Sequence, residues 1–351
     1  MLALICRDDV FTLLTLMYRN IPTNLIIGFL GTGKTTTILH LLSQAPAGQR
    51  WAVLVNEFGH IGVDGDLIQT EAGDHAEVFV EEVAGGCLCC VGSTGMQVGL
   101  NRLIHSAKPD RILIEPTGLG HPAQLIQQLT GPMYGEVIDL RATIGLVDAR
   151  MLSDSRYTSH PNFQDQLHLA DVLIGNKLDG YSDADRDAFY SLVEAQNSSK
   201  KAAVMVAHGG LKQAYLDAPR LERTALFPEA HAFKANTQHH DHHQEHKPSC
   251  GDWNRIEGAA DGFYTASWTL PADALFDPGC MRQIMVMSSV VRMKGYLPSS
   301  HGQLRINATP GEWSEEALEQ QVKPRIEMIS TDPLDWRVIE RKLRDCVENA
   351  C

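Results

Sequence analysis

The chain has 351 residues, of which 44% are hydrophobic and 21% are charged. This composition suits a globular chain of two domains and argues against a disordered or fibrous one. The formal net charge is −13 and no block of Lys or Arg offsets it, so we expect neither nucleic acid nor a membrane surface as a partner. No stretch reaches the roughly 18 consecutive apolar residues of a transmembrane helix, so we expect a soluble, cytoplasmic protein.

Residues 1–21 are predicted to be an N-terminal extension, because the first convincing strand begins at Asn24. Charged residues interrupt the apolar character of this segment, and no small-residue cleavage site follows it, which argues against a secretion signal. Met17 is an alternative initiator, in which case most of the extension would not be translated.

Short apolar runs bounded by polar or turn residues follow in chain order, and the segments between them are long enough for crossover helices. The runs lie at residues 24–28, 51–56, 110–115, 142–148, 171–176 and 201–207. Near-continuous apolar strands that alternate with helices indicate a parallel sheet covered on both faces. We therefore expect an α/β domain over residues 22–225, with a doubly wound, mostly parallel sheet.

A glycine-rich segment follows the first run and opens a helix. It matches the phosphate-binding pattern G-x-x-x-x-G-K-[ST] from Gly28 to Thr35. Backbone N–H groups and the helix N-terminus would surround the phosphates, Lys34 would reach the β- and γ-phosphates, and the Thr35 hydroxyl would bind Mg²⁺. The residues expected to contact the nucleotide here are Gly28, Gly31, Thr32, Gly33, Lys34, Thr35 and Thr36.

Three cysteines lie within four positions in the sequence GGCLCC: Cys87, Cys89 and Cys90. Thiolates this close can share one soft or borderline metal, and they suit Zn²⁺ with a fourth ligand supplied elsewhere or left open. Candidates for the fourth ligand are Glu57, which we favour, His60, Glu81 and Glu82. A redox pair or inert buried thiols are the alternatives. We expect reduced thiols throughout, with Cys6, Cys280, Cys346 and Cys351 structural or incidental.

The run at 110–115 ends in Glu115 and continues Pro-Thr-Gly. A carboxylate at this strand end can orient a water on Mg²⁺, and Gly118 can give a backbone N–H to the γ-phosphate. A merely buried strand-end glutamate is the alternative. We predict Lys34, Thr35 and Glu115 as catalytic residues. Hydrolysis should be slow or dependent on a partner or ion, because no glutamine is evident for the attacking water and no arginine finger is evident either.

The sequence Asn-Lys-Leu-Asp at 176–179 follows a later strand on the same sheet edge. A carboxylate at Asp179 can accept hydrogen bonds from guanine N1–H and the 2-amino group, whereas adenine offers no donor at either position. An ordinary surface loop is the alternative, but the position after a phosphate loop favours a GTP site. We expect Asn176, Lys177 and Asp179 to bind the guanine base.

Beyond residue 225 the composition changes. Residues 226–255 are predicted to be a linker with a histidine-rich segment, whose histidines are His239, His240, His242, His243 and His246. It is either a solvated linker or, as we favour, a weak collector of Zn²⁺, Ni²⁺ or Co²⁺. Residues 256–351 are predicted to form a small α+β domain with an antiparallel sheet in the order β-α-β-β-β-α.

These motifs together resemble the CobW-type metallochaperone GTPases. GFLGTGKTT, VNEFGHIGVD, GGCLCC, EPTG and NKLD occur in that family's order, and Arg292–Gly295 matches its R-x-K-G motif. The chain from Asn24 onward looks most like the bacterial zinc-binding branch typified by YeiR. The resemblance implies GTP hydrolysis coupled to the binding and delivery of a transition metal, usually zinc and sometimes cobalt or another metal.

Chain order makes such coupling plausible. Residues 56–64 lie between the phosphate loop and Glu115, where GTPases carry the segment ordered by the γ-phosphate and Mg²⁺, and the three cysteines follow. A metal held there would sense which nucleotide is bound, and by linkage the nucleotide would change metal affinity by the same factor. One nucleotide state is therefore expected to hold the metal and the other to release it.

Three functions compete. The favoured one is a GTP-hydrolysing metallochaperone with GTP, a transition metal and an unidentified client metalloprotein as partners, and a homodimer is left open. The alternative is a regulatory or scaffold GTPase whose cysteines form a structural zinc site. The third, an ATP-dependent kinase, is disfavoured by Asp179.

Overall fold

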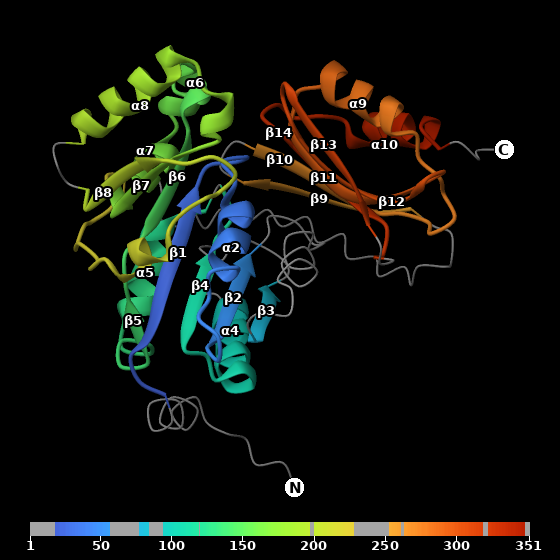
Figure 1. Ribbon diagram of the computed structural model, residues 1–351. Coiled ribbons are helices and arrows are strands. Elements are labelled where there is room, and N and C mark those ends of the chain that lie inside the picture. The colour runs from blue at the N-terminus through green and yellow to red at the C-terminus, as the bar shows by residue number, and fades with distance from the viewer. Residues whose placement is uncertain are drawn as a thin grey trace, which may run out of the picture. The chain divides into compact units, whose positions relative to one another are not determined.

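The computed structural model describes residues 18–56, 77–83, 94–118, 120–196, 200–227, 253–260, 263–318 and 322–347. They belong to two compact units (Figure 1). Within these residues no helix combines the length and the apolar character needed to cross a membrane. The predicted boundaries at residues 21, 225 and 255 stay predictions, and the histidine-rich segment lies outside the described residues.

The first unit is built on a parallel sheet of eight described strands in the order β3-β2-β4-β1-β6-β7-β8, with β5 paired to β1. The strands are β1 (Ile21–Gly28), β2 (Arg50–Asn56), β3 (Glu77–Val83), β4 (Arg111–Glu115), β5 (Ile138–Leu140), β6 (Ile144–Asp148), β7 (Val172–Asn176) and β8 (Ala202–Met205). All six predicted strands are confirmed. The prediction missed β3 and β5.

Helices cover both faces of this sheet. They are α2 (Lys34–Leu42), α4 (Thr94–Ala107), α5 (Pro122–Thr130), α6 (Ser155–Thr158), α7 (Pro161–Leu169) and α8 (Asp183–Ala195). Ile26 of β1 packs with Leu41 of α2 in one core cluster. Its neighbours Leu25 and Ile27 point to the opposite face and are equally buried, at 0% and 1% exposed. Successive residues of a strand point to opposite faces, and both faces of this sheet are buried. The strand sequences are therefore continuous apolar runs.

The position of β1 determines where a ligand can bind. From β1 the chain runs to β2 and β3 on one side, returns to β4, and then builds β6, β7 and β8 on the other side. In open α/β sheets the ligand crevice lies at the carboxyl ends of the strands where the order reverses. The carboxyl end of β1 is therefore the favoured place for a site, and the predicted doubly wound architecture is confirmed.

The second unit is an antiparallel sheet in the order β13-β12-β11-β14-β10-β9. Its elements are β9 (Asn254–Ala260), β10 (Phe263–Thr269), α9 (Pro278–Met287), β11 (Val290–Ser299), β12 (Gly302–Thr309), β13 (Glu312–Leu318), β14 (Arg325–Ser330) and α10 (Trp336–Asp345). Both helices pack in one core cluster with Trp268, Ile306 and Ile326, so they cover a single face (Figure 1). The predicted α+β class is confirmed, whereas the predicted strand order lacked β9 and β13.

Two features of this second unit bear on the sequence predictions. A disulfide joins Cys280 of α9 to Cys346 at the end of α10, so the expectation of reduced thiols is wrong for this pair. The cross-link joins residues 66 positions apart and therefore restricts the unfolded chain strongly. The R-x-K-G motif lies on β11, where Lys294 is directly opposite Glu327 of β14 and both are buried.

Candidate nucleotide-binding site

The phosphate loop connects the carboxyl end of β1 to the first turn of α2, as predicted. Gly28 has φ 155° and Gly33 has φ 89°. A Cβ on Gly28 would lie 2.7 Å from the carbonyl oxygen of Leu146, and one on Gly33 would lie 2.4 Å from Nδ2 of Asn176. Both glycines are therefore required by backbone conformation and by close approach of neighbouring strands.

Lys34 and Thr35 begin α2, and both side chains are buried. Nζ of Lys34 donates hydrogen bonds to the carbonyl oxygens of Gly28 at 3.0 Å and Phe29 at 3.3 Å, so its ammonium group lies within the loop. The Thr35 hydroxyl donates to Oε1 of Glu115 at 3.2 Å. A hydroxyl and a carboxylate are hard oxygen ligands, so this pair fits Mg²⁺.

The other residues predicted to contact phosphate differ in exposure. Thr32 is fully buried and its hydroxyl donates to the carbonyl oxygen of Phe29, so it stabilises the loop itself. Thr36 is exposed on α2. Gly118 lies against the phosphate loop, since a Cβ there would be 3.0 Å from the backbone nitrogen of Leu30.

A glutamine that sequence analysis did not find lies beside Gly118. Nε2 of Gln166 in α7 donates to the carbonyl oxygen of Gly118 at 3.0 Å, and the side chain is 4% exposed. The two residues are 48 positions apart in the chain. No local pattern signals this contact, because only the packing of α7 brings them together.

The Asn-Lys-Leu-Asp sequence leaves the sheet at the end of β7, two strands away from β1. Asn176 is buried, its Nδ2 donates to the carbonyl oxygen of Thr32 at 2.9 Å, and its Oδ1 accepts from the backbone N–H of Gly209 at 3.0 Å. Asn176 thus connects the phosphate loop to the turn that follows β8. Both polar groups of its side chain are therefore hydrogen-bonded within the protein.

Lys177 and Asp179 lie on the outer side of the same turn. Lys177 has φ 67°, and its Nζ is 3.5 Å from Oδ2 of the buried Asp148. The Asp179 side chain is 48% exposed, with Oδ1 4.0 Å from Nε2 of His208. A half-exposed carboxylate at a sheet edge is suitably placed to accept hydrogen bonds from a base.

Two neighbours complete this part of the site. His208 and Gly209 have φ 50° and 70°, so the chain turns sharply after β8 and presents His208 to Asp179. The sequence prediction missed them, although the Gly pair at 209–210 was an available turn signal.

Burial raises the pKa of Tyr181, whose hydroxyl accepts the N–H of Ala149 beside Asp148, so this phenol stays neutral.

The predicted metal ligands are not tested by the structure. Glu57, Cys87, Cys89, Cys90 and the five histidines of 239–246 lie outside the described residues. Among the residues that are described, no group of three or more His, Cys, Asp or Glu could hold a metal ion. Glu81, a candidate fourth ligand, accepts a hydrogen bond from Arg102 at 2.7 Å.

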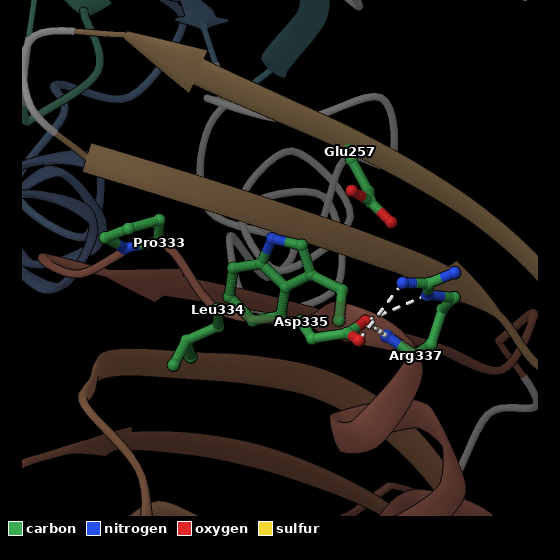
Figure 2. A pocket seen from close by; sticks show the side chains of 6 residues that line it. Glu257, Pro333, Leu334, Asp335 and Arg337 are labelled. Atoms are coloured by element: carbon green, nitrogen blue, oxygen red, sulfur yellow. Dashed lines mark hydrogen bonds and ion pairs between the residues drawn. The ribbon is translucent and has the colours of Figure 1, made fainter.

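A hollow in the second unit is a possible alternative site (Figure 2). It has a volume of about 580 Å³ and is lined by Glu257 and residues 333–337. Its charged groups pair with neighbours: Asp335 accepts from Nε of Arg337 at 3.0 Å, and Glu257 accepts from Arg255 at 2.8 Å. Because these charged groups already pair with neighbours, we favour the site at the end of β1, where the phosphate loop, a lysine and a carboxylate lie together.

Comparisons with known proteins agree with this geometry. Residues 22–204 match the family model "CobW/HypB/UreG, nucleotide-binding domain". The chain is 39% identical over 331 residues to the zinc chaperone YeiR of Escherichia coli, covering 92% of this chain and 96% of that protein. It is 34% identical over 185 residues to the zinc chaperone CobW of Pseudomonas aeruginosa, covering 45% and 49%.

A solved structure, zinc-bound YjiA GTPase from E. coli, is similar with a TM-score of 0.39 and 18% identity, covering 94% of this chain and 99% of that one. The assignment rests on the sequence comparisons, because that TM-score is too low to support an argument. The phosphate loop, Glu115 and Asn176–Asp179 all fall inside the matched range, which confirms the resemblance. The chain therefore belongs to the CobW/HypB/UreG family of nucleotide-binding proteins.

Proposed function

We propose that this protein is a GTP-hydrolysing metallochaperone that binds zinc at Cys87, Cys89 and Cys90 and couples nucleotide state to zinc delivery. One observation supports the nucleotide-binding part of this proposal. The phosphate loop and the Asn-Lys-Leu-Asp turn lie at the same edge of the sheet, joined by the hydrogen bond from Asn176 to Thr32. The metal half is supported by relatives that are named zinc chaperones.

Each residue of the phosphate half has a defined role in this proposal. Lys34 exchanges the carbonyl oxygens of Gly28 and Phe29 for phosphate oxygens, so its buried charge remains compensated. Thr35 and Glu115 hold Mg²⁺, which supplies positive charge to the β- and γ-phosphates. Gly118 gives its N–H to the γ-phosphate. Turnover is expected to be slow, because no arginine finger is evident in the sequence.

The base half selects guanine. Asp179 accepts the N1–H and 2-amino hydrogen bonds, and the aliphatic part of Lys177 is held beside the base by its contact with Asp148. Adenine would leave the carboxylate facing an acceptor, which is costly. Competition between GTP and ATP tests this selection and also tests the kinase alternative.

Zinc is the cargo in this proposal. Cys87, Cys89 and Cys90, with Glu57 as the fourth ligand, lie in chain segments that adjoin β2, β3 and α4. Co²⁺ and Ni²⁺ are alternative cargoes for the same thiolates. The histidines at 239–246 collect metal weakly, and an unidentified client metalloprotein in the cytoplasm receives it. Homodimerisation stays an open part of the proposal.

The decisive experiment measures the zinc affinity of the reduced protein with GDP and with a non-hydrolysable GTP analogue. GTP turnover is followed with and without zinc. The variant Cys87→Ala/Cys89→Ala/Cys90→Ala should lose both the zinc site and the dependence of turnover on zinc. Cys351→Ala is the matched control and should retain both.

A regulatory or scaffold GTPase with a structural zinc site is the alternative, and the same experiment separates the two. A structural site binds zinc equally in every nucleotide state, and chelation unfolds the protein. A delivery site changes affinity with the nucleotide and exchanges its metal without unfolding. Equal zinc affinity with GDP and with the GTP analogue would reject the chaperone proposal.

A further inference from the structure

Helix α7 and the short α6 before it contact the phosphate loop through aromatic side chains. Phe29, inside the loop, has its ring centroid 4.8 Å from that of Tyr157 and 6.3 Å from that of Phe163. Tyr157 and Phe163 are themselves 4.5 Å apart. The phosphate loop is therefore packed against α6 and α7. A displacement of the loop would displace these helices, and a displacement of the helices would displace the loop.

The same helix also contacts the segment that follows β4, through Gln166. Its Nε2 donates to the carbonyl oxygen of Gly118 at 3.0 Å. The segment from Glu115 to Gly118 is thus held at both ends, by Thr35 at Glu115 and by Gln166 at Gly118. Under the proposed function this segment is the one that receives the γ-phosphate.

The amide oxygen of Gln166, in contrast to its nitrogen, has no hydrogen-bond partner among the described residues. This oxygen, Oε1, is buried. The side chain borders a cavity of about 10 Å³, also lined by Gly28, Val147 and Phe163, which is close to the smallest space that admits a water. A buried acceptor without a partner is costly, so stability alone does not explain a glutamine at this position.

We propose that Gln166 is a positioning residue for GTP hydrolysis, which holds Gly118 in the orientation that receives the γ-phosphate and so couples α7 to the nucleotide state. The inference rests on the proposed function and deepens it. Gln166 touches Gly118 rather than the reacting atoms, so its effect should appear only for ligands that carry a γ-phosphate. GDP binding does not require that orientation.

The test compares Gln166→Met with Gln164→Met. Gln164 lies on the same helix, and its Nε2 also donates to a backbone carbonyl, that of Thr158 at 3.1 Å, so it is a matched control. We expect Gln166→Met to weaken binding of the GTP analogue and to lower kcat by about three- to tenfold, the equivalent of one hydrogen bond. GDP affinity and the thermal unfolding temperature should stay near the wild-type values, and Gln164→Met should change neither nucleotide parameter.

A second variant, Gln166→Glu, separates positioning from packing. An ionised carboxylate cannot donate to Gly118, whereas a protonated one can, so turnover relative to wild type should recover as the pH is lowered towards the pKa of the new carboxyl group. Equal losses of GDP and GTP-analogue affinity in Gln166→Met, or a loss of turnover in Gln166→Glu that persists at low pH, would overturn the inference. If the wild-type protein hydrolyses no GTP, the proposed function itself fails; if it does and Gln166→Met is unchanged, only this inference fails.

Discussion

The phosphate half and the base half of the site are built differently. In the phosphate half Lys34, Thr35 and Glu115 are 5%, 8% and 3% exposed and bond to one another or to loop carbonyls. In the base half the Asp179 side chain is 48% exposed. Under the proposed function, phosphate is bound by backbone and buried groups, whereas base selection depends on an exposed side chain that can change without disturbing the core.

Asn176 is where the two halves meet. It is buried like the phosphate residues but belongs to the Asn-Lys-Leu-Asp sequence, and it bonds to Thr32 on one side and Gly209 on the other. Its substitution should therefore affect stability and binding together. Variants of the two halves and of the surrounding scaffold test this difference, and they are given in decreasing order of expected effect.

Lys34→Ala should abolish the function of the phosphate half. Loss of the ammonium removes the charge that compensates the β- and γ-phosphates, and we expect kcat/KM for GTP to fall by about a hundredfold or more. Steady-state GTP hydrolysis measures the effect. Lys212→Ala, which removes an exposed lysine that is not among the predicted site residues, is the control and should leave kcat/KM unchanged. Comparable activity in both variants would contradict the assigned role.

Asn176→Ala should damage both halves. It removes a donor to Thr32 and an acceptor for Gly209, two buried hydrogen bonds that together contribute about 2–3 kcal/mol. We expect a lower free energy of unfolding in urea and weaker binding of GTP and GDP alike. Asn176→Asp keeps the acceptor for Gly209 but places a buried carboxylate oxygen against the carbonyl oxygen of Thr32, so it should lose at least as much stability as Asn176→Ala. A smaller loss in Asn176→Asp would show that the hydrogen bond to Thr32 contributes little.

Asp179→Asn should alter base selection and leave the fold intact. The new amide keeps one acceptor oxygen and replaces the other with a donor, so guanine loses the partner of one of its two N–H donors, while xanthine, with an oxo group in place of the 2-amino group, gains a partner. GTP affinity should fall at least about tenfold, as expected for hydrogen bonds to a charged group, and affinity for xanthosine triphosphate should rise. Competition binding at constant pH measures both. An unchanged preference for guanine would show that Asp179 does not read the base.

Ser182→Ala should affect stability alone and only slightly. Ser182 caps α8, its hydroxyl accepts the Asp185 N–H at 3.3 Å, and loss of such a cap costs about 1 kcal/mol. Hydrogen bonds from Ser182 hold the pKa of Asp185 below its usual range, so this contribution is present above the unfolded pKa and is lost as the pH falls through the folded pKa. Ser191→Ala on the exposed face of α8 is the control. A change in nucleotide affinity would contradict a purely structural role for the Ser182 cap.

Most of the fold could be predicted from the sequence because central strands of a covered parallel sheet must be apolar on both faces. The strands that were missed lie mainly at edges. β3 and β13 each carry three glutamates and occupy the outer positions of their sheets, as does β9. An edge strand has one neighbour and an exposed side, so its sequence need not be apolar.

The site divides in the same way. The phosphate loop, the carboxylate at the end of β4 and the Asn-Lys-Leu-Asp turn could all be located from the sequence alone, because each depends on residue types at fixed local spacing. Three contacts are visible only in the folded structure: Gln166 bonds to Gly118 across 48 positions, Asn176 bonds to Thr32 of the phosphate loop, and Cys280 pairs with Cys346. These contacts join residues far apart in the chain, and they follow from how helices and strands pack, which no local pattern records.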